Sequence, residues 1–198
     1  MPSNKQPKSL DELLAKTGAM LASGELSAEE KIDLEGRLKQ VEEMPPEERE
    51  SIRYFLTHMP EMDSDLTLVV LKGHLLIEQK IREFISERVL SPAAVDEAHL
   101  TSYQALCLAE ALTLPNDEPK RLWSILRKLN ALRNKLAHKL DPYGIQERAE
   151  EIRAEYSATW QIQSGFIGVL GHAYGQLSEL VRLARNPSFQ VRGRDPSQ

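Results

Sequence analysis

Apolar residues recur every three or four positions along most of the chain, and turn-forming residues separate the periodic segments. The clearest case is residues 66–89, which carry two apolar rows. The first row is Leu68, Leu71, Leu75, Ile81 and Ile85, and the second is Val69, Leu76 and Phe84. This pattern predicts a long, heavily buried helix. No stretch alternates apolar and polar residues convincingly between turns. The chain is therefore predicted to be all-α.

The first 62 residues are predicted to form three short helices, which we interpret as an N-terminal helical extension. Ser9 with Glu12 and Ser27 with Glu30 fit the capping box, in which two side chains satisfy free amides of the first helical turn. The "MPP" at 44–46 ends the second pattern, and "PEMDSD" follows the third.

Residues 63–186 are predicted to form the main helical bundle, and residues 187–198 a flexible tail. Ser91 and Pro92 suit a helix start, and further helices are expected over 102–114, 120–140, 145–158 and 162–185. Asn116 or Asp117 can cap the helix 120–140, and the turn residues 141–144 end it. The last helix holds Gly165, Gly168, Gly171 and Gly175, whose cost to a helix predicts close helix packing there, within the chain or across a dimer.

Composition describes an ordinary globular protein, with 198 residues, 41% hydrophobic and 28% charged. The net charge of -5 means that any binding of nucleic acid must come from a local basic patch. The longest apolar run, "LTLVVLKGHLLI", is interrupted by Lys72 and His74, and the N-terminus has no apolar signal segment. We therefore expect a cytoplasmic protein without a membrane partner.

Positive charge is concentrated between Lys120 and Lys139, where seven lysines and arginines occur without an acid. At about 100° per residue, one face of this helix is apolar and the opposite face carries a row one turn apart: Arg127, Ala131, Asn134 and His138. Arg133 lies about 40° from the centre of the apolar stripe and about 140° from His138. The two can converge only if Arg133 reaches out to the polar side, the helix kinks, or a second subunit contributes.

The stretch "LRNKLAH" resembles the signature of HEPN domains, in which an arginine and a polar residue precede a histidine on one helix. The wider pattern over about residues 65–142, from "GHLLIEQKIREFI" through "YQALCLAEALTL" to "LNALRNKLAH", resembles HEPN-like families related to the mannitol operon repressor. This resemblance implies a HEPN-like helical bundle. It also implies metal-independent RNA cleavage, in which a ribose 2′-hydroxyl attacks the adjacent phosphate and leaves a cyclic phosphate end.

On that interpretation His138 is the general acid or base, Arg133 holds the phosphate, and Asn134 orients one of them. Glu78 is expected to orient Arg133, with Arg127 in a supporting position on the polar face. A homodimer suits the chemistry, because one histidine cannot easily act on both sides of the phosphorus. No cofactor or metal is expected, since the pair His74 and Glu78 has no third ligand.

The resemblance places the protein in a defence, stress or toxin-antitoxin setting, with RNA and an antitoxin or other protein as partners. The minimal toxin branch carries a tyrosine two residues after the histidine, where this chain has Leu140, which argues against that branch. The alternative is a non-catalytic HEPN-like regulator or interaction module that binds a nucleotide, nucleic acid or protein. In the plainest alternative, Arg133 pairs with Glu78 or Glu110, and Asn134 and His138 are only solvated.

Overall fold

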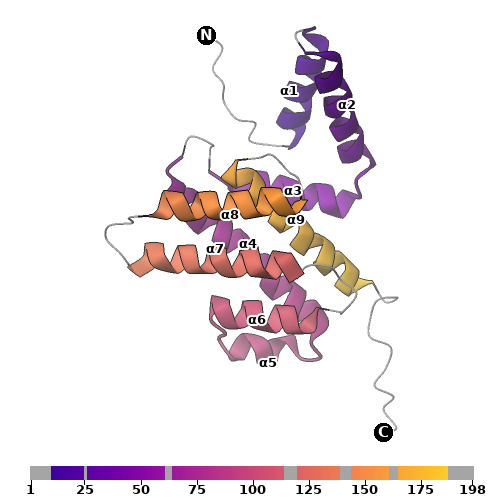
Figure 1. The fold of residues 1–198 in the computed structure, drawn as a ribbon. Helices are drawn as coiled ribbons and strands as arrows, with labels where there is room; N and C mark the ends of the chain where they lie inside the picture. The colour runs from indigo at the N-terminus through magenta and orange to yellow at the C-terminus, as the bar shows by residue number, and fades with distance from the viewer. Residues whose placement is uncertain are drawn as a thin grey trace. The chain divides into compact units, whose positions relative to one another are not determined.

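A computed structural model describes residues 10–24, 26–60, 64–113, 120–138, 144–160 and 165–186 (Figure 1). Within them the secondary structure is α-helical, with no strand, which confirms the predicted all-α class. The helices are α1 (Leu10–Ala22), α2 (Ala28–Glu43), α3 (Pro46–His58), α4 (Leu66–Arg88), α5 (Pro92–Glu97), α6 (Ser102–Leu112), α7 (Lys120–His138), α8 (Ile145–Trp160) and α9 (Phe166–Arg185). No helix in these ranges is both long enough and apolar enough to cross a membrane.

Local capping chemistry explains where several helices begin. Ser27 and Glu30 form the predicted capping box at α2, and Thr101 with Gln104 forms another at α6 that the sequence analysis did not identify. Ser9, Asn116, Asp117 and the turn residues 141–143 lie outside the described residues. Gly144 follows that turn with a φ of 77°, a left-handed conformation that favours glycine.

The chain divides into two compact units, Met1–Asp63 and Ser64–Gln198. In the first unit, α1 packs against both α2 and α3. Leu10 of α1 and Phe55 of α3 are its buried apolar residues, and Asp11 pairs with Arg53 at 3.5 Å. The short helices of this unit therefore share a small core of their own.

The second unit is built around α4, which packs against α5, α6, α7 and α9. Helices α7 and α8 run side by side, and α8 in turn packs on α9 (Figure 1). The buried face of α4 includes Val70, Ile77, Phe84 and Ile85, each at most 2% exposed. The predicted long helix is thus the central element of the unit, and it presents both apolar and polar side chains to its neighbours. It is less completely buried than predicted, because Leu68 and Leu75 of the first apolar row are 42% and 62% exposed.

Helices α4 and α9 pack closely at Gly73. A Cβ atom added there would lie 2.5 Å from Cδ1 of Leu170, which is well inside van der Waals contact. The glycines predicted to pack closely behave differently, because a Cβ at Gly165 or Gly175 would meet nothing within 4 Å. Close packing within the chain was therefore the wrong expectation for these two glycines: Gly165 is the N-cap of α9, where the helix-interior cost does not apply, and Gly175 borders open space.

Helices α8 and α9 are joined by a polar and aromatic contact. The Tyr156 hydroxyl is hydrogen-bonded to Nδ1 of His172, and Trp160 lies against Tyr156 with ring centroids 4.2 Å apart. Burial raises the pKa of Tyr156 and lowers that of His172, so the hydroxyl donates and the neutral imidazole accepts. His172 and Trp160 therefore contribute to the packing of α8 on α9.

Candidate functional site

The candidate site is built on α7, which continues as one α-helix to His138. Its predicted apolar stripe is buried, with Leu122, Leu126, Leu129 and Leu132 each at most 2% exposed. Trp123 joins this core at 1% exposure, as expected for a core anchor. The opposite side is partly open to solvent, because Ala131 is exposed and Arg127 and Asn134 are half-buried, and Arg133 at the border of the core is half-buried too.

Arg133 reaches from the border of the core toward the polar row. Its Nη1 donates a hydrogen bond to Oδ1 of Asn134 at 3.2 Å, so the guanidinium leans to the side of the helix on which Asn134 lies. Asn134 and His138 are four residues apart on the unbroken helix, which puts them on the same face. The side chain of His138 lies outside the described residues. The sequence analysis left three ways to bring Arg133 to this face: a long side chain that reaches out, a kinked helix or a second subunit. The structure shows the first, because the Arg133 side chain extends to Asn134.

Two other cations of α7 have acidic partners on neighbouring helices. Arg127 pairs with Glu110 of α6, and Lys128 pairs with Glu155 of α8. Arg127, predicted to support the site, is thus tied into the α6–α7 contact. Glu110 is paired with Arg127. The plainest alternative, in which Arg133 pairs with Glu78 or Glu110, therefore loses one of its two carboxylates.

Glu78, predicted to orient Arg133, is engaged by other groups. Its Oε1 accepts hydrogen bonds from Nε and Nη2 of Arg82 at 3.0 and 2.7 Å. Its Oε2 accepts one from the Ser102 hydroxyl at 2.5 Å. In the described part of the chain, Arg133 is not a hydrogen-bond partner of this carboxylate. Glu78 instead holds the first turn of α6 against α4, and Arg82 reinforces this by donating to the Leu100 carbonyl at 2.8 Å.

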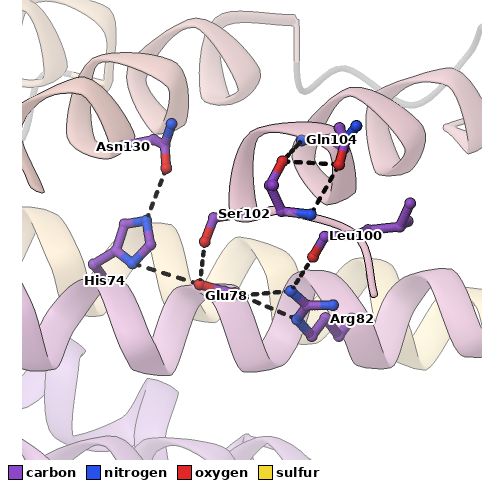
Figure 2. Close-up of polar contacts among 8 residues, drawn as sticks. His74, Glu78, Arg82, Leu100, Ser102, Gln104 and Asn130 are labelled. Carbon is purple, nitrogen blue, oxygen red and sulfur yellow. Dashed lines mark hydrogen bonds and ion pairs between the residues drawn. The ribbon is translucent and has the colours of Figure 1, made fainter. Parts of the chain in front are cut away.

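A buried polar pair continues this network toward α7 (Figure 2). Nε2 of His74 is hydrogen-bonded to Oδ1 of Asn130 at 3.1 Å, and Nδ1 of His74 lies 3.7 Å from Oε2 of Glu78. His74 and Asn130 are each only 5% exposed. Asn130 is one turn before Arg133 and Asn134 on α7. The network therefore runs from α6 through α4 to the turn of α7 that precedes the candidate site.

Charge and burial set the ionisation of this network. Burial lowers the pKa of His74, the hydrogen bond to Asn130 and the charge of Glu78 oppose this, and the charge of Arg133 lowers it further. Burial raises the pKa of Glu78, but hydrogen bonds from Ser102 and Arg82 and the charge of Arg82 outweigh it, so the pKa lies below its ordinary value. Near neutral pH, His74 is therefore neutral and Glu78 is a carboxylate.

Sequence reasoning placed His74 and Glu78 together as a buried or partner-facing pair but did not identify Asn130. The available signal was an amide directly after Leu129 in the apolar stripe of α7, since buried polar groups usually have hydrogen-bond partners. Such an amide predicts a polar side chain on the apolar face of the neighbouring helix, and His74 is that side chain. Within the described ranges, no group of three or more histidine, cysteine, aspartate or glutamate residues could hold a metal ion.

Comparison with known proteins gives no relative for this chain. No protein-family model matches it, and neither a curated protein nor a solved structure does. A function for this fold therefore has to be argued from the residues of α7 and their surroundings.

Proposed function

We propose that this protein is a metal-independent endoribonuclease with a HEPN-like bundle, and that Arg133, Asn134 and His138 form its active site. The observation that carries this proposal is the hydrogen bond from Arg133 to Asn134. It directs a guanidinium from the edge of the core to the face of α7 that also carries His138 one turn later. An arginine and an amide then lie on the face of α7 to which helical spacing assigns the histidine.

Each of these groups suits one task in RNA cleavage by transesterification. The ribose 2′-oxygen attacks the adjacent phosphorus, the bond from phosphorus to the 5′-oxygen breaks, and a 2′,3′-cyclic phosphate and a 5′-hydroxyl remain. An imidazole can remove the proton of the attacking hydroxyl or supply one to the leaving oxygen near neutral pH. A guanidinium can bind two phosphate oxygens and stabilise the negative charge that develops on them.

The ion pairs of α7 support Arg133 as the phosphate-binding group. Arg127 and Lys128 are each neutralised by a carboxylate from a neighbouring helix, whereas the hydrogen-bond partner of Arg133 is a neutral amide. Binding a phosphate at Arg127 or Lys128 would require breaking an existing ion pair. Among the described residues no carboxylate pairs with Arg133, so an anion that binds there has no such ion pair to break.

A homodimer in the cytoplasm is part of this proposal. One imidazole cannot readily act as the base and as the acid on opposite sides of the phosphorus, whereas two copies of α7 facing each other would supply both. The defence, stress or toxin-antitoxin setting expected from the resemblance belongs to the same proposal, with RNA as substrate and an antitoxin or other protein as a further partner. Helix α7 leaves its Arg133 face solvent-accessible for such an assembly.

The test is cleavage of a structured RNA in EDTA by wild-type protein and by the variants His138→Ala and Arg133→Ala. Matched controls are His58→Ala, whose imidazole bonds to its own helix in the first unit, and Arg153→Ala, which pairs with Glu150 on the surface of α8. We expect cyclic phosphate ends from the wild type and both controls. Loss of an active-site group should reduce the rate at least about 100-fold, as is typical when an acid-base or charge-stabilising group is removed.

Two results would contradict the proposal. Equal cleavage by wild type and His138→Ala would assign the activity to other residues or to a contaminant. No cleavage by any of the proteins, together with RNA binding that depends on Arg133, would favour the non-catalytic regulator in its place.

A further inference from the structure

His74 is a buried histidine with one nitrogen satisfied and the other not. Oδ1 of Asn130 can only accept, so the Nε2 bonded to it carries the proton of the neutral ring. Nδ1 is then an unprotonated acceptor that is buried without a hydrogen-bond partner. It faces another acceptor, Oε2 of Glu78, at 3.7 Å. Adding a proton to Nδ1 would replace this contact between two acceptors by an ion pair between the charged His74 imidazole and the Glu78 carboxylate.

Two factors disfavour a proton on Nδ1 of His74: the burial of the imidazole and the positive charge of Arg133. Arg133 follows Asn130 by three residues, so it belongs to the same part of α7 as the hydrogen-bond partner of His74. Glu78 acts in the other direction, and part of its charge is offset by Arg82. The ionisation of His74 is therefore balanced between a carboxylate on one side and the candidate phosphate-binding arginine on the other.

The remaining helices around His74 contribute no further charge. From α6 the neutral Ser102 hydroxyl reaches the same carboxylate oxygen, while Glu110 of that helix pairs with Arg127. From α9, Leu170 packs over Gly73. The two acids of α5 are exposed. The balance at His74 thus depends on Glu78, Arg82 and Arg133.

We propose that His74 takes up a proton at Nδ1 when a phosphodiester binds Arg133, so that this buried histidine strengthens anion capture at acid pH. The proposal rests on the proposed function only in that Arg133 is the phosphate-binding group. A bound phosphodiester cancels the positive charge that opposes protonation of His74. By thermodynamic linkage, a protonated His74 must then raise the affinity for the phosphodiester by the same factor.

The size of the effect follows from Coulomb's law. Two unit charges about 8 Å apart, at an effective dielectric constant of about 40, change an affinity about fivefold. His74 is thereby a positioning residue, because it acts on the phosphate through the charge it adds beside Arg133 and does not touch the substrate.

The experiment uses the full chain and a 2′-O-methylated uridine octamer without terminal phosphates. Its phosphodiesters keep one negative charge each between pH 5.5 and 7.5, and it lacks the hydroxyl needed for cleavage. Binding is measured at both pH values for wild type and His74→Gln, whose amide can still donate to Asn130 but cannot become charged. We expect the gain in affinity at pH 5.5 to be larger for wild type, with about fivefold as the upper limit, and with the contribution of His138 common to both proteins.

A second measurement needs no change at His74. The imidazole signals of wild-type and Arg133→Ala proteins are titrated by NMR with and without saturating octamer. Binding should raise the pKa of His74 in the wild type and leave it unchanged in Arg133→Ala.

The inference would be overturned if the octamer affinity of wild type and of His74→Gln depended equally on pH. It would also be overturned if the pKa of His74 were the same with and without the octamer. Octamer binding that is unaffected by Arg133→Ala would overturn it as well. Because the octamer cannot be cleaved, coupling without nuclease activity would refute only the proposed function, and nuclease activity without coupling would refute only this inference.

Discussion

Replacing Gly73 by alanine should destabilise the second unit, although alanine is normally the better residue in a helix. The added methyl group would lie 2.5 Å from Cδ1 of Leu170 and 3.3 Å from its Cγ and Cδ2. Leu170 is 2% exposed, so it has little room to move away. Overpacking of this kind costs about 1–3 kcal/mol, and the higher helix propensity of alanine returns about 1 kcal/mol.

Gly175→Ala is the matched control, because it also lies within a helix of the same unit and its Cβ would meet nothing within 4 Å. It should gain about 1 kcal/mol from helix propensity alone. Urea unfolding followed by tryptophan fluorescence suits the comparison, since both tryptophans, Trp123 and Trp160, lie in the second unit. Gly73→Ala should be less stable than Gly175→Ala by about 1–3 kcal/mol. Equal stability of the two variants would refute the close α4–α9 contact.

Three further predictions concern single side chains. Glu78→Gln should lower the free energy of unfolding by about 1–3 kcal/mol near pH 7, because it removes the charged acceptor of Arg82 and Ser102. The folded-state pKa of Glu78 lies below 4.5, so the difference in unfolding free energy between wild type and Glu78→Gln should be present above pH 4.5 and disappear as the pH falls through that lower value. Urea titrations that give a constant difference down to pH 2 would contradict this. Tyr156→Phe should cost about 1 kcal/mol by removing the hydrogen bond to His172, and an unchanged urea midpoint would speak against that bond. Arg133→Lys should keep the unfolding free energy within about 0.5 kcal/mol but weaken RNA binding about tenfold, because an ammonium cannot hold two phosphate oxygens in a fixed fork; filter binding at fixed salt measures this, and unchanged affinity would argue against bidentate binding.

The helices of this protein are largely readable from its sequence because the signals are local. The predicted long helix over residues 66–89 is α4, and the capping box at Ser27 begins α2. Periodicity reports which side of a helix is apolar, and burial follows that side closely in α7. Close packing within the chain was wrongly expected at Gly165 and Gly175, because glycine spacing does not reveal whether a neighbouring helix is close. The glycine that does pack closely, Gly73, has no such pattern around it.

The candidate site was less accessible to sequence reasoning, because it depends on how far individual side chains reach. Helix geometry puts Arg133 at the edge of the core, and only its rotamer brings the guanidinium to Asn134. Glu78 has partners from three places in the sequence, and its choice of Arg82 and Ser102 follows from how α6 docks on α4. The bond from Arg82 is local, one turn along α4, whereas the contact with Ser102 is tertiary. The residue types were therefore identifiable in advance, while the rotamer of Arg133 and the contact between helices were not.

The central claim is that a ribose 2′-hydroxyl performs the cleavage at the Arg133 and His138 face of α7. The most direct measurement uses an RNA in which the nucleotide on the 5′ side of a mapped cleavage site is replaced by its 2′-deoxy analogue. We predict that wild-type protein in EDTA no longer cuts that bond while it still cuts neighbouring sites to cyclic phosphate ends. Cleavage at the deoxy position, with a 5′-phosphate on the product, would contradict the account.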